Sequence, residues 1–419
     1  MVRHDYTANL SAAAFILAGM ITLAVMGAAP GALGDSPTPD SRLQAALTGR
    51  IGARDAVMVT SADGTIQAQI NADLPLVPAS ILKILTALAA LETLGSDFHF
   101  NTDFLADEAG NLKIKGYGDP LLVSERLQSI ARSLAMKRQQ FGDIILDDTY
   151  IEQPLKIPGR GASTQPYDAP NGALCVNFNT VAFERKGNRW VSAEAQTPLL
   201  PSVIPKIKAT GLSSGRITLA GDSDEALQYT GELFHYFLNQ AGVRTTGAVR
   251  RGAVDYRSDI LLWQHRSEDN LGEVLRALLE FSNNFMANQI LLVMGAHAYG
   301  PPATLEKGLA VITAFYHKTL GMTKGRIVEA SGISRRNRLT ARGMVTILNR
   351  FEPHHALLRS IAGQYYKTGH LKGIRTRAGY LADRSGSLYR FALLLNTPGK
   401  ATGPIMQIIQ EQLGTKGGD

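Results

Sequence analysis

Ser80 and Lys83 have the residue types and the spacing of a nucleophile and its base. Side chains three positions apart share one face of a helix, so the hydroxyl and the amine can meet. The residues from Ile84 to Leu91 are largely apolar on every face, which predicts a buried helix. Burial lowers the pKa of a lysine amine toward the range of a general base. The competing interpretation, a lysine that reaches solvent, needs a polar helix face, and none comes before Glu92.

A second hydroxyl and two amides interrupt a long apolar stretch further along the chain. Ser282-Asn283-Asn284 lies between apolar residues at positions 275, 278 and 279 and at positions 285, 286, 290 and 291. Polar groups in such surroundings need hydrogen-bond partners. The Ser282 hydroxyl could relay a proton, and the Asn284 amide could hold a substrate amide. The alternative is a helix break with local side-chain-to-backbone hydrogen bonds, and this motif alone does not separate the two interpretations.

The third motif, Lys367-Thr368-Gly369, lies on a predicted strand. Side chains alternate across a strand, and a glycine lets a substrate backbone approach closely. Such a strand could bind a peptide by strand addition and hold its terminal carboxylate. A solvated lysine on an edge strand is the alternative. Each of the three motifs, S-x-x-K, S-x-N and K-T-G, occurs once in the sequence, and they occur in this order.

The three motifs in this order resemble those of the serine penicillin-recognising enzymes. The flanking residues more narrowly resemble the D-alanyl-D-alanine carboxypeptidase/endopeptidase family, the low-molecular-mass class C penicillin-binding proteins. The stretches that carry this resemblance are Val77–Ser80, Gly116–Pro120, Tyr167–Pro170, Ser282–Ala287, Ser331–Arg335 and Asn337–Thr340. The resemblance therefore covers nearly all of the sequence after its N-terminal segment.

The resemblance implies a role for each residue of the first two motifs. Ser80 is expected to be the acylated nucleophile, and Lys83 is expected to be its base. Ser282 is expected to pass a proton to the leaving amine, and Asn284 to bind the peptide backbone of the substrate.

The resemblance also implies roles for the strand motif. Lys367 and Thr368 are expected to hold the terminal carboxylate of the substrate or to assist proton transfer. Gly369 leaves room for the substrate backbone. The backbone N–H groups of Ser80 and His370 are expected to form the oxyanion hole.

Two positions depart from the family's pattern. His370 stands where the family usually has a threonine, although only the backbone N–H of this residue is needed. Glu329-Ala330 stands where the family has Asp-Gly. The two departures bear on substrate preference and positioning more than on acylation.

The patterns at both ends of the sequence predict antiparallel strands with apolar helices. The pattern in the middle predicts short strands joined by turns that contain Gly and Pro. The simplest arrangement is one α+β domain built from residues 36–96 and 263–419, with residues 97–262 inserted into it. The resemblance implies a penicillin-binding, transpeptidase-like domain, an antiparallel sheet with helices on both faces. The insertion is predicted to be mostly β, with one or two lobes. The expected elements are strands at 56–60, 66–70, 364–381 and 388–396, and helices at 79–94, 124–136, 231–240, 270–294, 305–320 and 404–413.

The N-terminal segment predicts export. Arg3 and His4 precede an apolar stretch over 10–29, and small residues follow it. The stretch has about 20 residues, which is also enough to anchor a chain in a membrane. We therefore expect residues 1–29 to be a signal peptide or an anchor, and the protein to lie in the periplasm. The Pro-rich residues 36–40 are a predicted linker.

Composition excludes several classes of protein and site. The 43 Lys+Arg and 36 Asp+Glu give a net charge of +7 that is spread along the chain, unlike the basic patch of a nucleic-acid-binding protein. The single cysteine, Cys175, forms no intrachain disulfide and no metal-binding cysteine cluster, and its predicted strand indicates a buried hydrophobe. The nine histidines show no H-E-x-x-H spacing, which argues against a metalloprotease. The function predicted below implies no metal or organic cofactor.

These observations together predict an exported serine peptidase that acts on peptidoglycan peptides through an acyl-enzyme. It would remove a terminal D-alanine, cut D-Ala-linked cross-bridges, or both, and β-lactams would inhibit it by acylating Ser80. The loop Glu-x-x-Leu-Asn of class A β-lactamases and the Tyr-x-Asn of class C are both missing from the sequence. The rival prediction is a catalytically silent penicillin-binding protein that binds the wall or senses β-lactams. Peripheral membrane association and the oligomeric state stay open.

Overall fold

The computed structural model describes residues 41–219 and 223–415. The predicted leader (1–29) and the predicted linker (36–40) lie outside these residues. Within the described ranges, no helix is both long and apolar enough to span a membrane.

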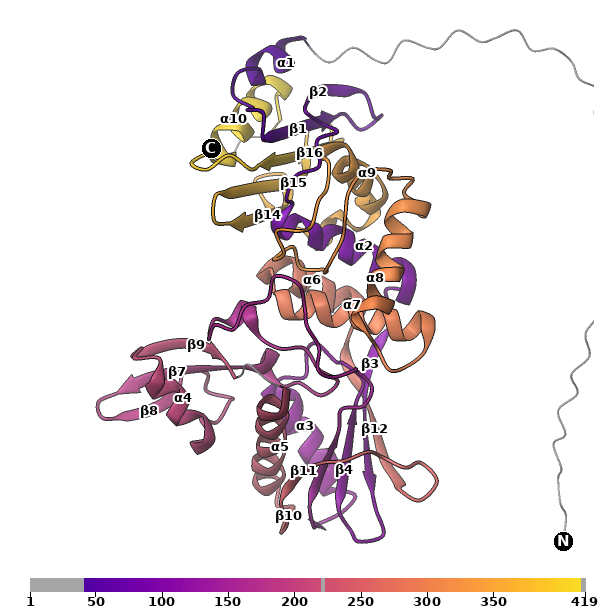
Figure 1. Cartoon of the computed structure of the whole chain (residues 1–419), viewed down its shortest axis with the longest axis vertical. Helices are drawn as coiled ribbons and strands as arrows, with labels where there is room; N and C mark the ends of the chain where they lie inside the picture. The colour runs from indigo at the N-terminus through magenta and orange to yellow at the C-terminus, as the bar shows by residue number, and fades with distance from the viewer. Residues whose placement is uncertain (1–40, 220–222, 416–419) are drawn as a thin grey trace, which may run out of the picture. The chain divides into compact units, whose positions relative to one another are not determined.

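Strands from the two ends of the described chain form one antiparallel sheet (Figure 1). Its order is β13-β14-β15-β16-β1-β2. The bounds are Asp55–Thr60 (β1), Ile66–Ile70 (β2), Arg359–Ile361 (β13), Gln364–Leu371 (β14), Ile374–Ala382 (β15) and Leu388–Leu395 (β16). The register of β1 on β16 runs from Asp55↔Leu395 to Thr60↔Arg390, so opposite ends of the sequence become neighbours in the sheet.

Helices cover both faces of this sheet because side chains alternate along its strands. Ala56 and Met58 of β1 belong to one core, and Val57 and Val59 belong to another. The first core contains side chains of α2 (Leu82–Leu94), α6 (Leu271–Phe281), α7 (Asn284–Tyr299), α8 (Leu305–Ala314) and α9 (Ala341–Phe351). The second contains side chains of α1 (Ser41–Leu47) and α10 (Thr402–Leu413). The predicted fold class, α+β with helices on both faces of an antiparallel sheet, is confirmed.

Helix α2 is buried along most of its length, as its apolar sequence predicts. All nine residues from Leu82 to Ala90 are buried. A 3₁₀ turn over Ala79–Ile81 precedes it, and Gly95, with φ of 83°, ends it. The helix predicted over 79–94 is confirmed, with its first turn tightened to 3₁₀ geometry.

The apolar stretch predicted as helical over 270–294 consists of two helices. Asn270 and Glu273 form a capping box at the start of α6. Ser282 ends α6 with φ of 57°, and the Asn283 side chain accepts a hydrogen bond from the Met286 N–H at 3.2 Å to cap α7. The Ser-Asn-Asn motif is therefore a helix break with a local side-chain bond, and this break places Asn284 in the first turn of α7.

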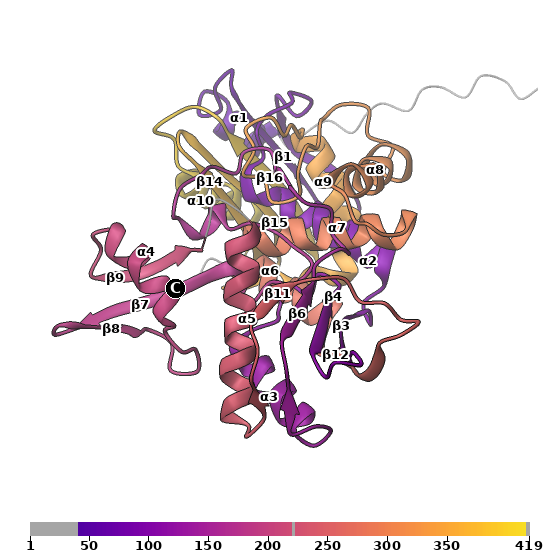
Figure 2. The same ribbon diagram turned by 60° about the horizontal axis from the view of Figure 1, so that its bottom comes forward.

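The middle of the chain contains a second sheet of five strands in the order β11-β6-β4-β3-β12. Their bounds are His99–Ala106 (β3), Leu112–Gly116 (β4), Ile144–Asp147 (β6), Val249–Arg251 (β11) and Ile260–Asn270 (β12). Helices α3 (Ser124–Ala135) and α5 (Ser223–Gln240) pack with it in a separate core (Figure 2). A short parallel pair, β5 (Gln140–Phe141) and β10 (Arg244–Thr245), lies in the same part of the sequence.

A smaller antiparallel sheet, in the order β8-β7-β9, also lies in this middle region. Its strands are Thr180–Lys186 (β7), Arg189–Ser192 (β8) and Ser214–Thr218 (β9). The short helix α4 (Ile204–Ala209) comes between β8 and β9 in the sequence.

Two predicted elements have the wrong extent because of a glycine. The strand predicted over 364–381 is a hairpin of β14 and β15, which turns at Gly373 with φ of 76°. The helix predicted to start at Gly231 starts at Ser223 instead, and Gly231 lies inside it. A Cβ at position 231 would lie 2.3 Å from Cγ1 of Val249, so the glycine serves close packing here and does not mark a boundary.

Two further predictions are wrong in type. The helix predicted over 305–320 changes after Ala314 into a π-helical turn, Phe315–Thr319. Cys175 is buried, as predicted, but lies in an irregular segment and not in a strand. Its Sγ accepts a hydrogen bond from Asn179 Nδ2 at 3.0 Å, so local side-chain bonds take the place of strand pairing.

Helix α8 gives a test of this packing. A Cβ at Gly308 would lie 2.5 Å from the carbonyl oxygen of Leu291 on α7. Gly308→Ala should therefore destabilise the protein by about 1–3 kcal/mol through overpacking, although alanine favours helices by about 1 kcal/mol. The matched control is Gly403→Ala in α10, where a Cβ meets no atom within 4 Å. Urea unfolding should show the control unchanged or stabilised, and equal stabilisation of both variants would contradict the packing of α7 on α8.

Candidate active site

The amine of Lys83 lies among groups from three distant parts of the chain. Its Nζ is 3.2 Å from Oγ of Ser80. It donates to Oδ1 of Asn284 at 2.8 Å and to the carbonyl oxygen of Ser331 at 2.6 Å. The Lys83 side chain is 0 % exposed, so the interpretation of a lysine that reaches solvent is wrong. The structure thus brings together Ser80, Lys83 and Asn284, three of the predicted site residues.

Burial and charge set the protonation of the two lysines of the motifs. Burial and, to a smaller extent, the positive charge of Lys367 together lower the pKa of Lys83 to about 7, against an opposing effect of Glu329. Burial also lowers the pKa of Lys367, to about 8. Near neutral pH, a large share of Lys83 is therefore the free amine, which can accept a proton.

Strand β14 brings the third motif against the backbone of Ser80. A Cβ at Gly369 would lie 2.7 Å from the backbone nitrogen of Ser80, so only glycine allows this approach. Lys367 and Gly369 are buried, whereas Thr368 and His370 are exposed, in keeping with the alternation along the strand.

Two non-glycine residues beside the motifs adopt the left-handed backbone conformation. Ala79, directly before Ser80, has φ of 49°, and Ser282 has φ of 57°. Such residues cost about 1–3 kcal/mol each and persist where the surroundings enforce them. The hydroxyl of Thr376 donates to the carbonyl of Pro78 at 2.7 Å, and Gly332 packs so closely that a Cβ would lie 1.9 Å from the Ala79 oxygen. These contacts hold the turn that carries Ser80.

The side chains of four predicted site residues make no hydrogen bond to this cluster. One of them is Lys367, whose amine donates to the Thr368 carbonyl at 3.3 Å. Ser282 is two residues before Asn284, and its hydroxyl has no hydrogen-bond partner among the described residues. The side chains of Thr368 and His370 are exposed and bond neither Ser80 nor Lys83.

Glu329 is a fully buried carboxylate that organises the loop around the Ser331 carbonyl. Each of its two oxygens accepts three hydrogen bonds. The donors are Gly332 N (2.7 Å), Ser334 N (3.3 Å) and Asn337 Nδ2 (2.6 Å) on Oε1, and Ser331 N (2.7 Å), Ser331 Oγ (2.6 Å) and Asn288 Nδ2 (3.3 Å) on Oε2. This carboxylate thereby fixes the carbonyl that accepts from Lys83. Within the described part of the chain, no three His, Cys, Asp or Glu side chains gather as a metal site would require.

The sequence analysis noted position 329 only as a departure from a family pattern, and missed its role. The available sign was an acidic residue directly after the apolar pair Ile327-Val328. A carboxylate in such surroundings is stable only with many donors around it. The donors themselves follow within eight residues, except for Asn288 on α7.

Comparison with known proteins decides the family. Residues 41–210 and 211–364 match the D-Ala-D-Ala carboxypeptidase 3 (S13) family, which is more than half of the chain. The protein belongs to this family. The predicted family and the predicted serine-type carboxypeptidase class of enzyme are thus confirmed. The S-x-x-K and S-x-N motifs lie inside the matched residues, and Lys367-Thr368-Gly369 lies just after their C-terminal end.

Sequence relatives and solved structures match most of this S13-family chain. A D-alanyl-D-alanine carboxypeptidase of Actinomadura sp. is 27% identical over 400 residues, which cover 80% of this chain and 73% of the relative. The structure of penicillin binding protein 4 from Haemophilus influenzae matches with a TM-score of 0.72 at 19% identity, covering 88% of this chain and 98% of that one. Bd3459, a peptidoglycan endopeptidase of Bdellovibrio bacteriovorus, matches with a TM-score of 0.54 at 16% identity, over 87% and 94% of the two chains. At these identities the structural matches show a shared fold.

The Glu329 cluster yields a test. In Glu329→Gln, an NH₂ group replaces one of the two carboxylate oxygens. In either orientation of the amide, this NH₂ faces three donors and cannot accept their hydrogen bonds. Leaving buried donors unpaired costs about 1–3 kcal/mol each, so we expect at least ~2 kcal/mol of destabilisation in chemical denaturation. The matched control is Glu280→Gln on the exposed end of α6, which should change stability by less than ~0.5 kcal/mol. Equal stabilities of the two variants would show that the Glu329 carboxylate does not hold the loop.

Proposed function

We propose that this S13-family enzyme hydrolyses D-Ala-containing peptide bonds of peptidoglycan through an acyl-enzyme on Ser80. One observation carries the proposal: a fully buried lysine amine lies 3.2 Å from the Ser80 hydroxyl. A weakly nucleophilic hydroxyl needs an adjacent base at working pH, and an amine with a pKa of about 7 is such a base.

In the proposed reaction, the Lys83 amine takes the proton of Ser80, and the serine oxygen attacks the carbonyl carbon of the penultimate D-alanine. The peptide C–N bond then breaks as Ser282 passes a proton to the leaving amine. Water hydrolyses the resulting ester and restores Ser80. Asn284 would bind the substrate backbone. Its side-chain oxygen accepts a hydrogen bond from Lys83, and this contact holds the Asn284 amide close to the proposed base.

Strand β14 would supply the remaining contacts in this mechanism. Lys367 and Thr368 would hold the substrate carboxylate, since Lys367 carries a positive charge below about pH 8. The backbone N–H groups of Ser80 and His370 would bind the developing oxyanion. The absence of a side chain at Gly369 keeps the strand close to Ser80.

The relatives' names support both the carboxypeptidase and the endopeptidase reaction, so we propose that the enzyme removes terminal D-alanine, cuts cross-bridges, or does both. Its place of action would be the periplasm, with residues 1–29 as a signal peptide or anchor. We also propose that residues 36–96 and 263–419 form the catalytic domain around the insertion 97–262. This division is supported by the six-stranded sheet, in which β1 and β2 pair with strands from the C-terminal part of the chain.

We further propose that β-lactams inhibit the enzyme by acylating Ser80, the proposed nucleophile in the 3₁₀ turn before α2. A solved structure of the Haemophilus influenzae protein is a complex with a β-lactam, at 19% identity to this chain. A catalytically silent, β-lactam-sensing protein would also be labelled. D-Alanine release from a wall peptide therefore distinguishes the enzyme from the sensor.

Substitution of the nucleophile tests the proposal. Ser80→Ala should abolish both covalent labelling by benzylpenicillin, seen as a mass increase of the intact protein, and D-alanine release from a pentapeptide muropeptide. Ser129→Ala, an exposed serine on α3, should keep both. Hydrolysis retained by Ser80→Ala would remove Ser80 from the mechanism. Labelling of the unaltered enzyme without any D-alanine release would instead favour the sensor.

The pH dependence tests the roles of the two lysines. Activity on a peptide with a free carboxylate should fall about tenfold per pH unit below about 7, because Lys83 becomes protonated. It should also fall above about 8, because Lys367 loses its charge. Stopped-flow or discontinuous assays of kcat/KM from pH 5 to 10 measure both limbs.

The variant Lys367→Gln separates these two limbs. It removes a positive charge that lowers the pKa of Lys83, so the acid limb of its residual activity should move to higher pH. The alkaline limb should disappear. An unchanged profile would mean that neither lysine titrates in the step that limits kcat/KM.

A further inference from the structure

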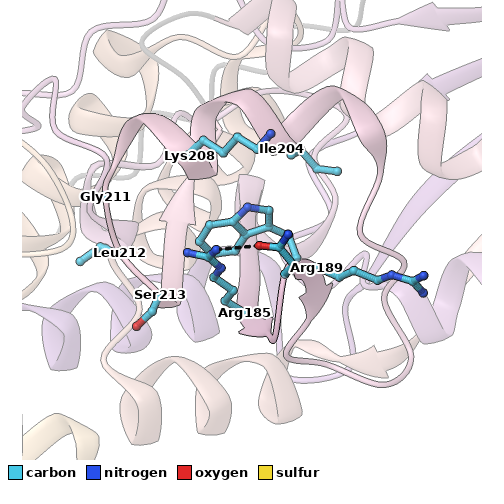
Figure 3. Close-up of a pocket in the computed structure, with 9 residues that line it drawn as sticks. Arg185, Arg189, Ile204, Lys208, Gly211, Leu212 and Ser213 are labelled. Atoms are coloured by element: carbon cyan, nitrogen blue, oxygen red, sulfur yellow. Dashed lines mark hydrogen bonds between the residues drawn. The ribbon is translucent and has the colours of Figure 1, made fainter.

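A pocket of about 780 Å³ lies in the small lobe formed by β7, β8, β9 and α4. Figure 3 shows Ile204 and Lys208 on the helix, Arg185 and Arg189 on the hairpin of β7 and β8, and Leu212 on the loop before β9. None of the residues that line it belongs to the motifs around Ser80 and Lys83. It is therefore a separate candidate binding site.

The lining of this pocket carries positive charges and no acidic side chain that could balance them. Arg185, Arg189 and Lys208 line it, and no Asp or Glu does. Arg189 and Lys208 are exposed, and neither makes a side-chain hydrogen bond or ion pair with another described residue. Clustered like charges repel one another, so a concave site that keeps them unpaired favours an anionic ligand.

The acidic residues of the lobe are already paired elsewhere. Residues 180–218 contain six Lys or Arg and two Asp or Glu. Glu184 forms an ion pair with Lys186 at 2.8 Å, and Glu194 pairs with Arg216. Neither carboxylate lines the pocket, so the lobe's excess of positive charge is concentrated at this opening.

An aromatic ring gives the pocket a second kind of surface. Trp190 is half-buried, and its indole packs edge-on against Phe183 with centroids 5.7 Å apart. The Arg185 guanidinium lies 5.7 Å from the centroid of the Trp190 ring. It donates hydrogen bonds to the Gly187 carbonyl and to Oδ1 of Asn188. Leu212, which is 45 % exposed, adds apolar area. A ligand that fits this lining has a flat apolar face and anionic groups beside it, as a sugar ring with a nearby carboxylate has.

We propose that this pocket binds the carboxylate-bearing glycan of peptidoglycan and so holds the enzyme on its polymeric substrate. The proposal rests on the proposed function, since it takes the polymer of that reaction as the ligand. A concave pocket with a half-buried indole suits a sugar ring better than a lipid surface, which is bound by apolar side chains that project outward. Arg189 and Lys208 would pair with carboxylates, and Trp190 would stack on the ring.

Charge reversal tests the pocket without disturbing packed residues. In an Ser80→Ala background, which prevents digestion, the double variant Arg189→Glu/Lys208→Glu should sediment with isolated peptidoglycan at least tenfold more weakly than its parent. The peptidoglycan is first stripped of phosphate-bearing polymers with acid. The matched control, Lys137→Glu/Lys318→Glu, reverses two exposed lysines that have no described partner and should bind as the parent does. Equal binding of both double variants would overturn the proposal.

The same substitutions with Ser80 intact keep this inference distinct from the proposed function. Release of D-alanine from a short muropeptide should stay within twofold of the unaltered enzyme, while release from intact peptidoglycan falls. Failure of every form to cut the muropeptide would contradict the proposed function and leave the sedimentation result standing. Loss of binding to vesicles of acidic phospholipid, with peptidoglycan binding unchanged, would assign the pocket to a membrane and overturn the glycan assignment. Trp190→Ala, checked for an unchanged unfolding temperature, should also weaken peptidoglycan binding.

Discussion

The burial of one amine is the constraint on which the rest of the site depends. A charged ammonium would donate three hydrogen bonds, whereas a neutral amine has two N–H donors and one lone pair. Lys83 has two strong acceptors, the Asn284 amide oxygen at 2.8 Å and the Ser331 carbonyl at 2.6 Å, and a third, longer contact with Ser80 Oγ at 3.2 Å. The neutral form can donate to the first two and offer its lone pair to the serine hydroxyl. This geometry supports the proposed base role, because the two strong acceptors orient the lone pair without consuming it.

Placing that amine requires close approach of backbone segments that are distant in the sequence. Asn284 is 201 positions from Lys83, and Ser331 is 248. The approach depends on glycines where a side chain would collide, Gly332 against Ala79 and Gly369 against Ser80. Left-handed backbone at Ala79 and Ser282 stores strain beside two of the motifs. The rigid six-stranded sheet and its helices supply the packing that keeps these contacts in place.

The sequence predicted those parts of the site whose cause is local. The i, i+3 spacing and the apolar helix were enough to place the Ser80 hydroxyl beside a buried Lys83 amine. The role of Glu329 was missed because an apolar flank does not reveal which donors surround a carboxylate, and one of them, Asn288, comes from another helix. The same reason explains the wrong helix start predicted at Gly231. A glycine commonly marks a helix boundary, but here it allows close packing against Val249, which the local sequence does not reveal. In residues 364–381, the turn at Gly373 was not recognised inside a continuous strand-like pattern.

Two lysines in one site also explain how base and anion-binding roles can be kept apart. Both are buried, and burial lowers the pKa of each, to about 7 for Lys83 and about 8 for Lys367. The charge of Lys367 favours the neutral form of Lys83, so the residue that keeps its proton helps the other to lose it. A substrate carboxylate bound near Lys367 would stabilise that charge and preserve the division during binding. Between about pH 7 and 8 the site therefore holds a free amine beside the serine and an ammonium on the neighbouring strand, which is the combination that the proposed acylation needs.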